Sequence, residues 1–555
     1  MNTKNKLKIF SLGGRGEVGN NMIVMEYKDN ILILDAGVLF PDPYKYGIDL
    51  IIPDISYLID NKEKIKGIVF SHGHEDHIGA VPYIYHLLDV PLYGTDLTIG
   101  LIKNKLESAG LLDKARTQVI SEDKTLKLEP FEINFCHVNH SIPGCVAMAI
   151  STPVGLIIYT GDYKFDQTPI NNPQTDYQRL SQWGNQGVLA LLGDSTNSER
   201  EGHTLSEKVV AQNIEDSFKL VKQRIIIATF SSNIDRIQHI ITAGHNTGRK
   251  VAISGWSMQK TVEVASELGY LKIPEQTLIT IDQANKLEPG KVILLMTGSQ
   301  GEYRASLTKI ARGEHRDITT LPGDTVFLSS SPIPGNEKAI GDTINMLYEN
   351  GAEVLYDGML DLHASGHACQ EEIKMMINLI RPKYLIPVHG EFRHLYHHAQ
   401  LGRHMGLPVE NILIGQNGDI IEITPDSARL TDTLEIGQLY IESNKLSDTG
   451  DIVLKDRKRL AENGFIIIIL PATVNNNILP KPKLISRGFV FNKDSEKLLN
   501  GAKQRVIEYL DNKKEKTRDF SLIKKDIYHD LKKYFYEMTN RSPLILTEFV
   551  KVKGE

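Results

Sequence analysis

Short apolar runs that each end close to a polar residue recur along about the first 200 positions of the chain. Four such runs, each with the polar residue that follows it, are Ile31–Leu34 with Asp35, Ile65–Phe70 with Ser71, Leu156–Thr160 with Asp162, and Val188–Leu192 with Asp194. Apolar runs of this length, bounded by turn residues, predict buried β-strands. Because open α/β sheets bind ligands at the carboxyl ends of their strands, the polar residues after these runs are candidates for a functional site.

Strand-like and helix-like segments alternate again after Ser206 and predict a second α/β unit that reaches to about Met359. Its expected strands are Ile225–Ala228, Val251–Ser254, Val292–Met296 and Thr325–Leu328. A further strand, Tyr384–Val388, leads directly into His389.

The last part of the chain has a different pattern. The polar, broken stretch Asn417–Thr433 is interpreted as a linker to a smaller α+β segment. That segment is predicted to contain a strand at Phe465–Leu470 and helices at Ser495–Asp511 and Ser521–Phe535.

Length and composition favour a soluble protein of several domains. A chain of 555 residues is too long for one hydrophobic core, so two to four domains are expected. The net charge of −6 excludes a globally basic nucleic-acid binder and leaves only a local basic patch. From Gly501 to Glu555 there are 13 Lys and Arg against 9 Asp and Glu. This local excess is either a solvated helical face or a contact surface.

Cysteine usage and hydropathy predict a cytoplasmic protein with no membrane segment. The three cysteines, Cys136, Cys145 and Cys369, form no CxxC pair and are too few for a disulfide framework, which favours a reducing compartment. Met1–Phe10 has no apolar core of a secretion signal. Phe465–Leu470, the longest strongly apolar run, is far too short to cross a bilayer.

The strongest chemical signal is the HxHxDH arrangement formed by His72, His74, Asp76 and His77. It directly follows a predicted strand, and a tight loop there can point imidazole and carboxylate groups to two sides. These donors suit Zn²⁺ or Mn²⁺. A surface loop that is rich in histidine by chance is the bland alternative, and the regular spacing disfavours it.

Three more residues of the same kinds stand at predicted strand ends, namely His140, Asp162 and His389. Singly, each is weak, because a lone histidine is more often a satisfied core or surface residue. Together with the motif they supply what two metal ions about 3.5–4 Å apart require, which is terminal ligands for each ion and one bridging carboxylate.

Two weaker sequence patterns allow more than one interpretation. The Gly-rich stretch Gly13–Gly19 could pass for a dinucleotide fingerprint, but a second strand at Asn21–Tyr27 favours a tight hairpin. Arg236 and Arg487 could contact phosphates or could equally form ordinary surface ion pairs.

The order of these residues resembles the metallo-β-lactamase superfamily, and later motifs resemble its β-CASP subgroup, specifically the bacterial ribonuclease J family. The later motifs are Asp194-Ser195-Thr196, His363-Ala364-Ser365-Gly366-His367, His389-Gly390-Glu391, Thr297–Glu302 and Ser486–Val490. The resemblance covers nearly the whole chain. It departs from the family pattern at Gly144-Cys145, at Ala368-Cys369 and at Asp451, none of which is a proposed ligand.

The resemblance implies a fold and domain boundaries. An αββα metallo-β-lactamase sandwich would occupy residues 1–205 and, with a linker, residues 362–433. A β-CASP α/β domain would be inserted at residues 206–361, and a small α+β oligomerisation domain would occupy residues 434–555.

The resemblance also implies roles for single residues. His72, His74 and His140 would hold one divalent ion, Asp76, His77 and His389 the other, and Asp162 would bridge them. The ions would be zinc, with manganese or magnesium possible for activity. Catalysis would involve His367 as general acid, Asp194 as its support, and Asp76, and Asp35 would orient the His loop. Around the phosphate of the terminal nucleotide would lie Ser329, Ser330, Ser331, His363 and Ser365.

The function so implied is hydrolysis of RNA to 5′-phosphate products, by 5′-3′ exonuclease and endonuclease activity, in RNA maturation and decay. The chain would form a homodimer or homotetramer, or a hetero-oligomer with a paralogue. Two alternatives are a small-ester or thioester hydrolase and a weakly active or non-catalytic partner subunit of an RNA-decay complex. The apolar stripe of Ile523, Ile527, Leu531, Tyr534 and Phe535 either packs within its own domain or pairs subunits.

Overall fold

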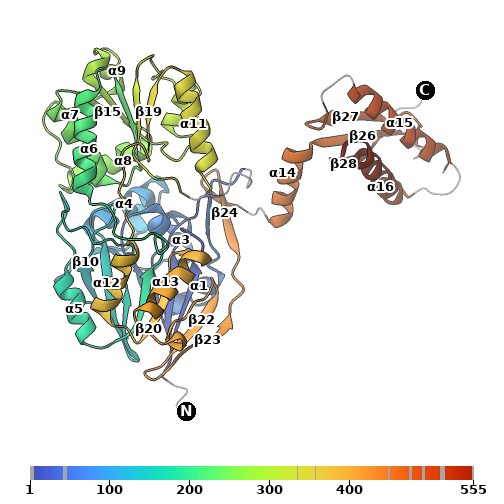
Figure 1. Ribbon diagram of the computed structural model, residues 1–555. Coiled ribbons are helices and arrows are strands. Elements are labelled where there is room, and N and C mark those ends of the chain that lie inside the picture. The colour runs from blue at the N-terminus through green and yellow to red at the C-terminus, as the bar shows by residue number, and fades with distance from the viewer. Residues whose placement is uncertain are drawn as a thin grey trace. The chain divides into compact units, whose positions relative to one another are not determined.

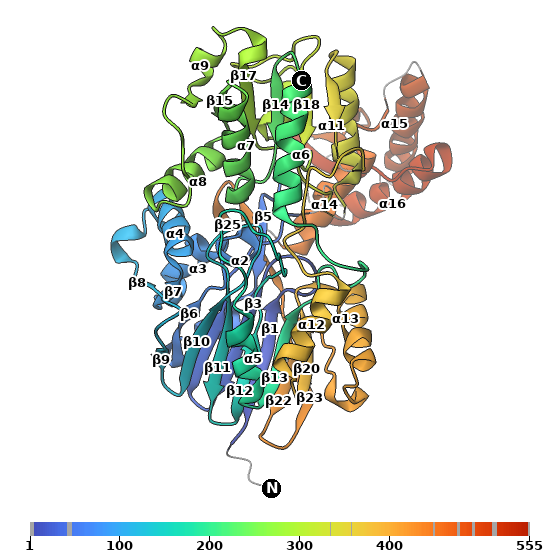
Figure 2. The ribbon, with the colours of Figure 1, turned by 60° about the vertical axis from the view of Figure 1, so that its left-hand side comes forward.

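The computed structural model describes residues 5–41, 47–333, 335–356, 358–447, 450–473, 478–490, 494–512 and 519–552. The chain divides into two compact units, shown in two views in Figures 1 and 2. The first comprises Met1–Phe40 and Leu50–Ile441, and the second comprises Pro41–Asp49 and Glu442–Glu555.

Two β-sheets form the centre of the metallo-β-lactamase part of the first unit. The eight-stranded sheet has the order β23 (Ala428–Thr433), β22 (Asp419–Ile423), β1 (Leu7–Gly13), β3 (Met22–Tyr27), β4 (Asn30–Leu34), β6 (Ile65–Val69), β7 (Leu92–Gly94) and β8 (Thr117–Val119). The six-stranded sheet has the order β20 (Tyr384–Val388), β13 (Val188–Asp194), β12 (Gly155–Tyr159), β11 (Val146–Thr152), β10 (Phe131–His137) and β9 (Leu126–Leu128).

The two sheets share an inner core of alternate residues, because successive side chains of a strand point to opposite faces. Ile9, Met25 and Leu32 of the larger sheet pack with Phe135 and Met148 of the smaller sheet. Helices α3 (Val81–Leu88), α4 (Asp96–Ser108), α5 (Tyr177–Asn185), α12 (Gln370–Ile380) and α13 (Phe392–His404) cover the outer faces. This is the predicted αββα sandwich.

The interpretation of Asn417–Thr433 as a linker is wrong. Its residues form β22 and β23, which add to the edge of the larger sheet through antiparallel pairing of Leu7 with Ile423. The short, mostly polar β23 lies at the sheet edge with five of its six residues exposed, so its sequence lacks the apolar run that marks a buried strand. The Gly13–Gly19 stretch does join two antiparallel strands, β1 and β3, as the hairpin interpretation expected.

The inserted α/β part is a sheet of six parallel strands. Their order is β16 (Leu278–Ile279), β15 (Lys250–Ser254), β17 (Val292–Met296), β14 (Ile225–Ala228), β18 (Thr325–Leu328) and β19 (Glu353–Leu355). Helices α6 (Glu207–Leu220), α7 (Ile234–Asn246), α8 (Trp256–Glu267), α9 (Ile281–Ala284), α10 (Ser306–Ala311) and α11 (Glu337–Glu349) connect and cover them (Figure 1). Ser206 caps α6, because its side chain accepts a hydrogen bond from the backbone N–H of Lys208.

Short elements complete the first unit. They are α1 (Ser56–Asp60), α2 (Glu75–Ile78), β2 (Arg15–Gly16) paired with β21 (Gly390–Glu391), and β5 (Leu50–Pro53) paired with β24 (Gln438–Glu442). The 3₁₀ turns are Lys62–Lys64, Leu112–Lys114, Pro289–Lys291 and Val409–Asn411.

The second unit has its own core. Its central strand β26 (Phe465–Ala472) pairs antiparallel with β27 (Lys483–Arg487) and parallel with β28 (Leu544–Lys551). Helices α15 (Asp494–Asn512) and α16 (Phe520–Thr539) pack on one face, and β25 (Lys445–Ser447) and α14 (Asp451–Asn463) precede the sheet. Ile523, Ile527, Leu531 and Phe535 are buried in this core, so the stripe packs within its own domain.

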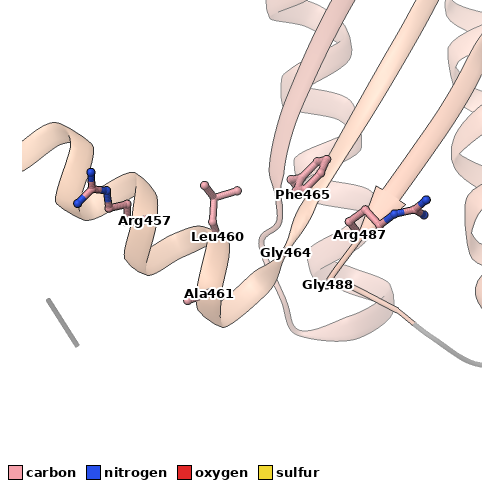
Figure 3. Close-up of a pocket in the computed structure, with 7 residues that line it drawn as sticks. All are labelled: Arg457, Leu460, Ala461, Gly464, Phe465, Arg487 and Gly488. Atoms are coloured by element: carbon pink, nitrogen blue, oxygen red, sulfur yellow. The ribbon is translucent and has the colours of Figure 1, made fainter. Parts of the chain in front are cut away.

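A shallow pocket of about 510 Å³ lies in the second unit between α14 and the strand ends (Figure 3). Arg457 and Arg487 line it, but in Figure 3 their side chains point away from each other. Arg457 forms an ion pair with Glu442 at 2.7 Å. The two guanidinium groups therefore do not converge on one anion.

No helix in the described part of the chain combines the length and the apolar character needed to cross a lipid bilayer.

Candidate metal centre

The structure brings all seven predicted ligands into one cluster, and each stands at or just beyond the carboxyl end of a strand or on the short helix α2. His72 and His74 lie on the loop after β6, and Asp76 and His77 lie in the single turn of α2 that follows. His140, Asp162 and His389 follow β10, β12 and β20. The sheets thus act as rigid supports that deliver polar side chains from both layers to one place.

The first group consists of three imidazoles and a carboxylate. Nε2 of His72 and Nε2 of His140 each lie 3.0 Å from Nδ1 of His74. Oδ2 of Asp162 lies 3.7 Å from both Nε2 atoms. Four donor atoms that converge in this way match the coordination that zinc prefers.

Asp162 also belongs to the second group. Its Oδ2 lies 3.2 Å from Nε2 of His77, and Oδ2 of Asp76 lies 3.6 Å from the same nitrogen. Nε2 of His389 lies 3.3 Å from Oδ2 of Asp76. One carboxylate therefore faces both groups of ligands.

The protonation states suit metal ligands in the first group, whereas in the second group a cation would have to displace a proton from each of His77 and His389. Burial lowers the pKa of these two rings, but the carboxylate of Asp162 outweighs it and raises both pKa values well above the ordinary one. Burial lowers the pKa of His74 to about 4 and holds the pKa of His72 and His140 well below the ordinary value, so these rings are neutral with free lone pairs. Burial raises the pKa of Asp162, but the neighbouring His389 and His77 outweigh it and hold that pKa well below its usual range.

Two buried atoms of the cluster, Oδ1 of Asp162 and Nε2 of His389, form no well-directed hydrogen bond among the described residues, although Oδ1 lies 3.1 Å from Nδ1 of His389 and Nε2 lies 3.3 Å from Oδ2 of Asp76. A buried carboxylate oxygen without a hydrogen bond is costly, and divalent cations would satisfy such atoms. The residues present therefore fit a metal centre.

Asp35 fixes the position of the loop that carries His72 and His74 through hydrogen bonds to the residues around it. This fully buried residue, in left-handed backbone conformation at φ 61°, directly follows β4. Its carboxylate accepts hydrogen bonds from the backbone N–H of Ser71 at 2.7 Å, the Ser71 hydroxyl at 2.9 Å and the Tyr159 hydroxyl at 2.7 Å. It also lies 2.9 Å from Nδ1 of His77, which leaves Nε2 of that ring to face the cluster.

Gly366 orients His140 in the same manner. Nδ1 of His140 donates to the carbonyl oxygen of Gly366 at 2.6 Å, so Nε2 faces the other imidazoles. A Cβ atom at position 366 would lie 2.4 Å from the ring of His140, so the close approach requires glycine.

His367 and Asp194 form a pair beside the cluster. Nδ1 of His367 lies 2.8 Å from Oδ2 of Asp194, and the ring is one-fifth exposed. Burial lowers the pKa of His367, but the carboxylates of Asp194 and Asp162 outweigh it and raise that pKa above the ordinary value. The donor atoms of Asp162, Asp194, His367 and His389 lie within 4.8 Å of one another, so distance alone would also allow His367 to hold an ion.

Three of the predicted phosphate-binding serines each form a hydrogen bond to a neighbouring residue. The Ser365 hydroxyl accepts from the backbone N–H of His367 at 3.2 Å, and Ser330 accepts from Gln300 at 3.0 Å. Ser329 donates to the carbonyl oxygen of Leu362 at 2.6 Å, next to His363. Because the Ser329 hydroxyl is fully buried and already engaged, it holds the 362–363 segment instead of offering a free donor. Ser331 is half-buried beside them.

Arg236 is neither a surface ion pair nor a free phosphate contact, so both earlier interpretations are wrong. It is fully buried, donates to the Ser329 hydroxyl and to the carbonyl oxygen of Leu362, and forms an ion pair with Glu207 at 2.9 Å. Glu207 in turn lies 3.3 Å from Nζ of Lys164, two residues after Asp162. This buried chain of charges connects the segment after β12, which carries Asp162, with the Ser329 segment.

One feature of the sequence indicates that Arg236 is buried and paired. Helix α7 carries isoleucines at positions 234, 237, 240 and 241, and the structure buries nearly all of its faces. A charged residue in a helix that is buried all round needs a buried partner.

Models of known families match most of the chain. The metallo-beta-lactamase superfamily matches residues 15–194, and the ribonuclease J beta-CASP domain matches residues 222–347. The Zn-dependent metallo-hydrolase RNA specificity domain matches residues 358–413, and the ribonuclease J C-terminal domain matches residues 452–552.

Full-length relatives agree with these matches. The chain is 42% identical to ribonuclease J 1 of Streptococcus pyogenes, with 98% of this chain and 97% of that protein covered. It is 37% identical to ribonuclease J2 of Bacillus subtilis, with 99% of each covered, and 40% identical to ribonuclease J of Thermus thermophilus, with 97% and 94% covered.

A solved structure of a protein of unknown function from Enterococcus faecalis shares the fold, with a TM-score of 0.52 and 17% identity, and covers 75% of this chain and 100% of that one. Given family models along the chain and relatives that span its full length at up to 42% identity, the chain belongs to the ribonuclease J family.

Proposed function

We propose that this chain is a metal-dependent ribonuclease that hydrolyses RNA phosphodiesters and leaves 5′-phosphate and 3′-hydroxyl ends. The observation that carries the proposal is the position of Asp162, whose Oδ2 lies 3.2 Å from His77 and 3.7 Å from His72. One carboxylate that faces two groups of ligands is what a pair of ions about 3.5–4 Å apart requires. Relatives named ribonuclease J along the whole length support an RNA substrate.

We assign the ligands of two divalent ions as follows. His72, His74 and His140 would hold one ion, Asp76, His77 and His389 the other, and Asp162 would bridge them. These nitrogen and oxygen donors favour zinc, and manganese or magnesium could support activity. Bound ions would supply the Lewis acidity that activates water and offsets charge on the phosphate.

His367 is the proposed general acid. Because Asp194 binds its Nδ1, the other ring nitrogen is left to face the substrate, where it donates a proton to the departing 3′-oxygen. The raised pKa of His367 keeps the ring protonated closer to neutral pH, as this role needs. Asp194 acts as a positioning residue, held in turn by the hydroxyl of Thr196 at 2.8 Å.

The finer activity is also part of the proposal. The chain would cut RNA internally and also release mononucleotides from the 5′ end, in the cytoplasm, as a homodimer, homotetramer or hetero-oligomer. The phosphate of the terminal nucleotide would lie near His363, whose Nδ1 is buried without a partner among the described residues, and near Ser330, Ser331 and Ser365. A site for one phosphate would exclude a triphosphate, so 5′-monophosphate RNA should decay faster.

The proposal is tested by incubating the full chain with 5′-monophosphorylated and 5′-triphosphorylated RNA, with and without EDTA. Metal-dependent release of mononucleotides, faster from the monophosphate, is the expected result. No turnover of any RNA by metal-loaded protein would contradict a ribonuclease and favour the non-catalytic subunit. Equal rates from both 5′ ends would reject the size-selective site alone.

A further inference from the structure

We propose that Trp256 and Tyr303 form a stacking surface for the bases of single-stranded RNA, one that leads to the phosphate-binding edge of the inserted sheet. The inference rests on the proposed ribonuclease function and adds the residues that receive the bases. It concerns binding of the strand, which can be measured separately from its hydrolysis.

The topology places both aromatic residues on the edge that carries Ser329. In a parallel sheet all strands end at the same edge, and here Trp256 follows β15, Tyr303 lies in the loop after β17, and Ser329 follows β18. Figure 2 shows these three strands in one sheet. Neighbouring strands lie about 4.8 Å apart, so the ends of β17 and β18, with β14 between them, are about 10 Å apart. That spacing is on the scale of a few nucleotides.

Contacts between the loops join these positions into one surface. A Cβ atom at Gly255, next to Trp256, would lie 3.1 Å from the hydroxyl of Thr297 on the loop after β17. On the same loop, Nε2 of Gln300 donates to the Ser330 hydroxyl and to the carbonyl oxygen of Ser331, each at 3.0 Å. The loop that carries Tyr303 is therefore bound to the proposed phosphate site.

The exposure of the two aromatic rings suits contact with RNA bases better than packing against another part of the protein. Trp256 is 65% exposed and Tyr303 is 72% exposed. The guanidinium carbon of Arg312 lies 3.6 Å from the centre of the Tyr303 ring, and the same guanidinium forms an ion pair with Glu314 at 2.6 Å, so it stacks on the ring with its charge offset. Single exposed aromatic residues are common and mean little, but two of them on the edge that carries the proposed phosphate site, one of them stacked with an arginine, match the way proteins bind single strands without sequence preference.

The chain provides its own reporter for the test, because it has two tryptophans. Trp183 is buried at 5% exposure, and Trp256 is exposed. A 5′-monophosphorylated oligouridine with phosphorothioate linkages, which slow hydrolysis, would be titrated into metal-loaded full-length protein. Tryptophan fluorescence and the anisotropy of a label at the RNA 3′ end would be read in parallel.

Bound RNA should quench the fluorescence of wild-type protein and of Trp183→Phe. Trp256→Ala should weaken RNA binding about 5- to 150-fold, because stacking of one base contributes about 1–3 kcal/mol. Trp256→Phe should lose the quenching signal yet bind within a few fold of wild type, since a ring remains. Tyr303→Ala should weaken binding in the same range, whereas Tyr348→Ala, which removes a half-exposed ring at the end of α11, should not.

The outcomes separate this inference from the proposed function. RNA that binds with unchanged affinity to Trp256→Ala and Tyr303→Ala, and that quenches nothing, would overturn the stacking surface while leaving the ribonuclease intact. RNA that shows no anisotropy change with wild-type protein would overturn both.

Discussion

Nδ1 of His367 lies 2.8 Å from Oδ2 of Asp194, and both residues stand beside the carboxylate of Asp162 that faces the two ligand groups. The contact fixes the imidazole by one nitrogen and leaves the other free. A histidine that is bound to a carboxylate in this way can serve as a proton donor through its other nitrogen, and the same arrangement at His77 and Asp35 orients a proposed metal ligand.

The first prediction separates these two roles. His367→Ala should lower kcat by about 10²- to 10⁴-fold, the usual contribution of a general acid, while metal content and RNA affinity stay at the wild-type level. Asp194→Asn should lower kcat less, because it misorients the ring without removing it. Metal analysis of the purified variants decides the case, since loss of one ion from His367→Ala would make this residue a ligand.

The second prediction concerns Asp35, which has no contact of its own with the proposed ions. Asp35→Asn should lower metal affinity about 10- to 100-fold, because an amide cannot accept all the hydrogen bonds that Ser71, Tyr159 and His77 direct at the carboxylate. Titration with a metal-buffered solution measures the effect. Tyr159→Phe, which removes one of these bonds, should show a smaller loss, and equal metal affinity in Asp35→Asn would remove its orienting role.

The third prediction counts ions. Wild-type protein should bind up to two ions per chain, and His74→Ala and His389→Ala should each bind about one fewer and lose turnover, since each removes a ligand from a different group. Elemental analysis and circular dichroism together distinguish loss of metal from loss of fold. His86→Ala, on the exposed face of α3, is the matched control and should change neither quantity. Full activity in His74→Ala would refute the assignment.

Local residue order was enough to predict most of the ligand cluster. The spacing of His72, His74, Asp76 and His77 places them within one loop and one helical turn, so their convergence follows from short-range geometry. Asp162 and His389 could be added because each follows a readable apolar run, and strand ends meet at a common edge. His140 follows a strand of mixed sequence, and its assignment as a ligand depended on the family resemblance.

What could not be predicted depends on contacts between distant parts of the chain. The partner of Arg236 is Glu207, and its hydrogen-bond acceptor is Ser329, 93 positions away. Nothing near position 236 marks those partners. Likewise β23 is a strand because β22 is its neighbour at the sheet edge, and its polar sequence alone predicts a loop.

The fourth prediction concerns pH and Asp235, which lies on α7 and belongs to none of the candidate ligand groups. Burial, together with the nearby carboxylate of Glu207, raises the pKa of Asp235 to about 7, with Lys164 and Arg236 acting in the opposite direction. His239, one turn along the helix, has its pKa lowered by burial to about 4 and is neutral above that pH. The amide of Asn172 donates to Asp235 at 2.6 Å.

Because the pKa of Asp235 is higher in the folded chain than the 3.8 of a free aspartate, the folded state holds its proton more tightly. Its contribution to stability is full below about pH 4 and is lost as the pH rises to 7, up to roughly 4 kcal/mol. Asp235→Asn should therefore gain in Tm over wild type as the pH increases from 5 to about 8. Thermal unfolding followed at several pH values tests this, and a Tm difference that does not change with pH would contradict it.

The last prediction concerns the second unit, which contains none of the proposed ligands. Its sheet has helices α15 and α16 on one face, while Ile467 and Ile469 on the other face are half-buried and Leu546 and Val550 remain 44% and 45% exposed. The same face also carries Lys483 and Glu548, both paired with Ile469, and Arg487, paired with Phe465, so it mixes apolar and charged residues. An open face of this kind is suited to pairing with a second copy, and stable interfaces usually bury about 1,200–2,000 Å² in total. The pairing therefore does not need the stripe on α16, which is already buried.

The point of truncation follows from strand pairing. A chain that ends at Thr433 would lose β24, whose Gln438 pairs with Pro53 of β5, so the cut belongs after Glu442. That shortened chain should fold and bind metal, because the ligand cluster and both sheets of the sandwich lie before it. It should be monomeric by light scattering and degrade RNA poorly.

Leu546→Lys in the full-length chain should also give monomers, since it places a charge on the open face but leaves the core of the unit intact. If the second unit adds phosphate contacts through its local excess of Lys and Arg, RNA turnover by the full chain should fall more steeply with salt than turnover by the truncated one. A truncated chain that remains dimeric would place the interface in the first unit, and equal salt slopes would reduce the basic excess to a solvated surface.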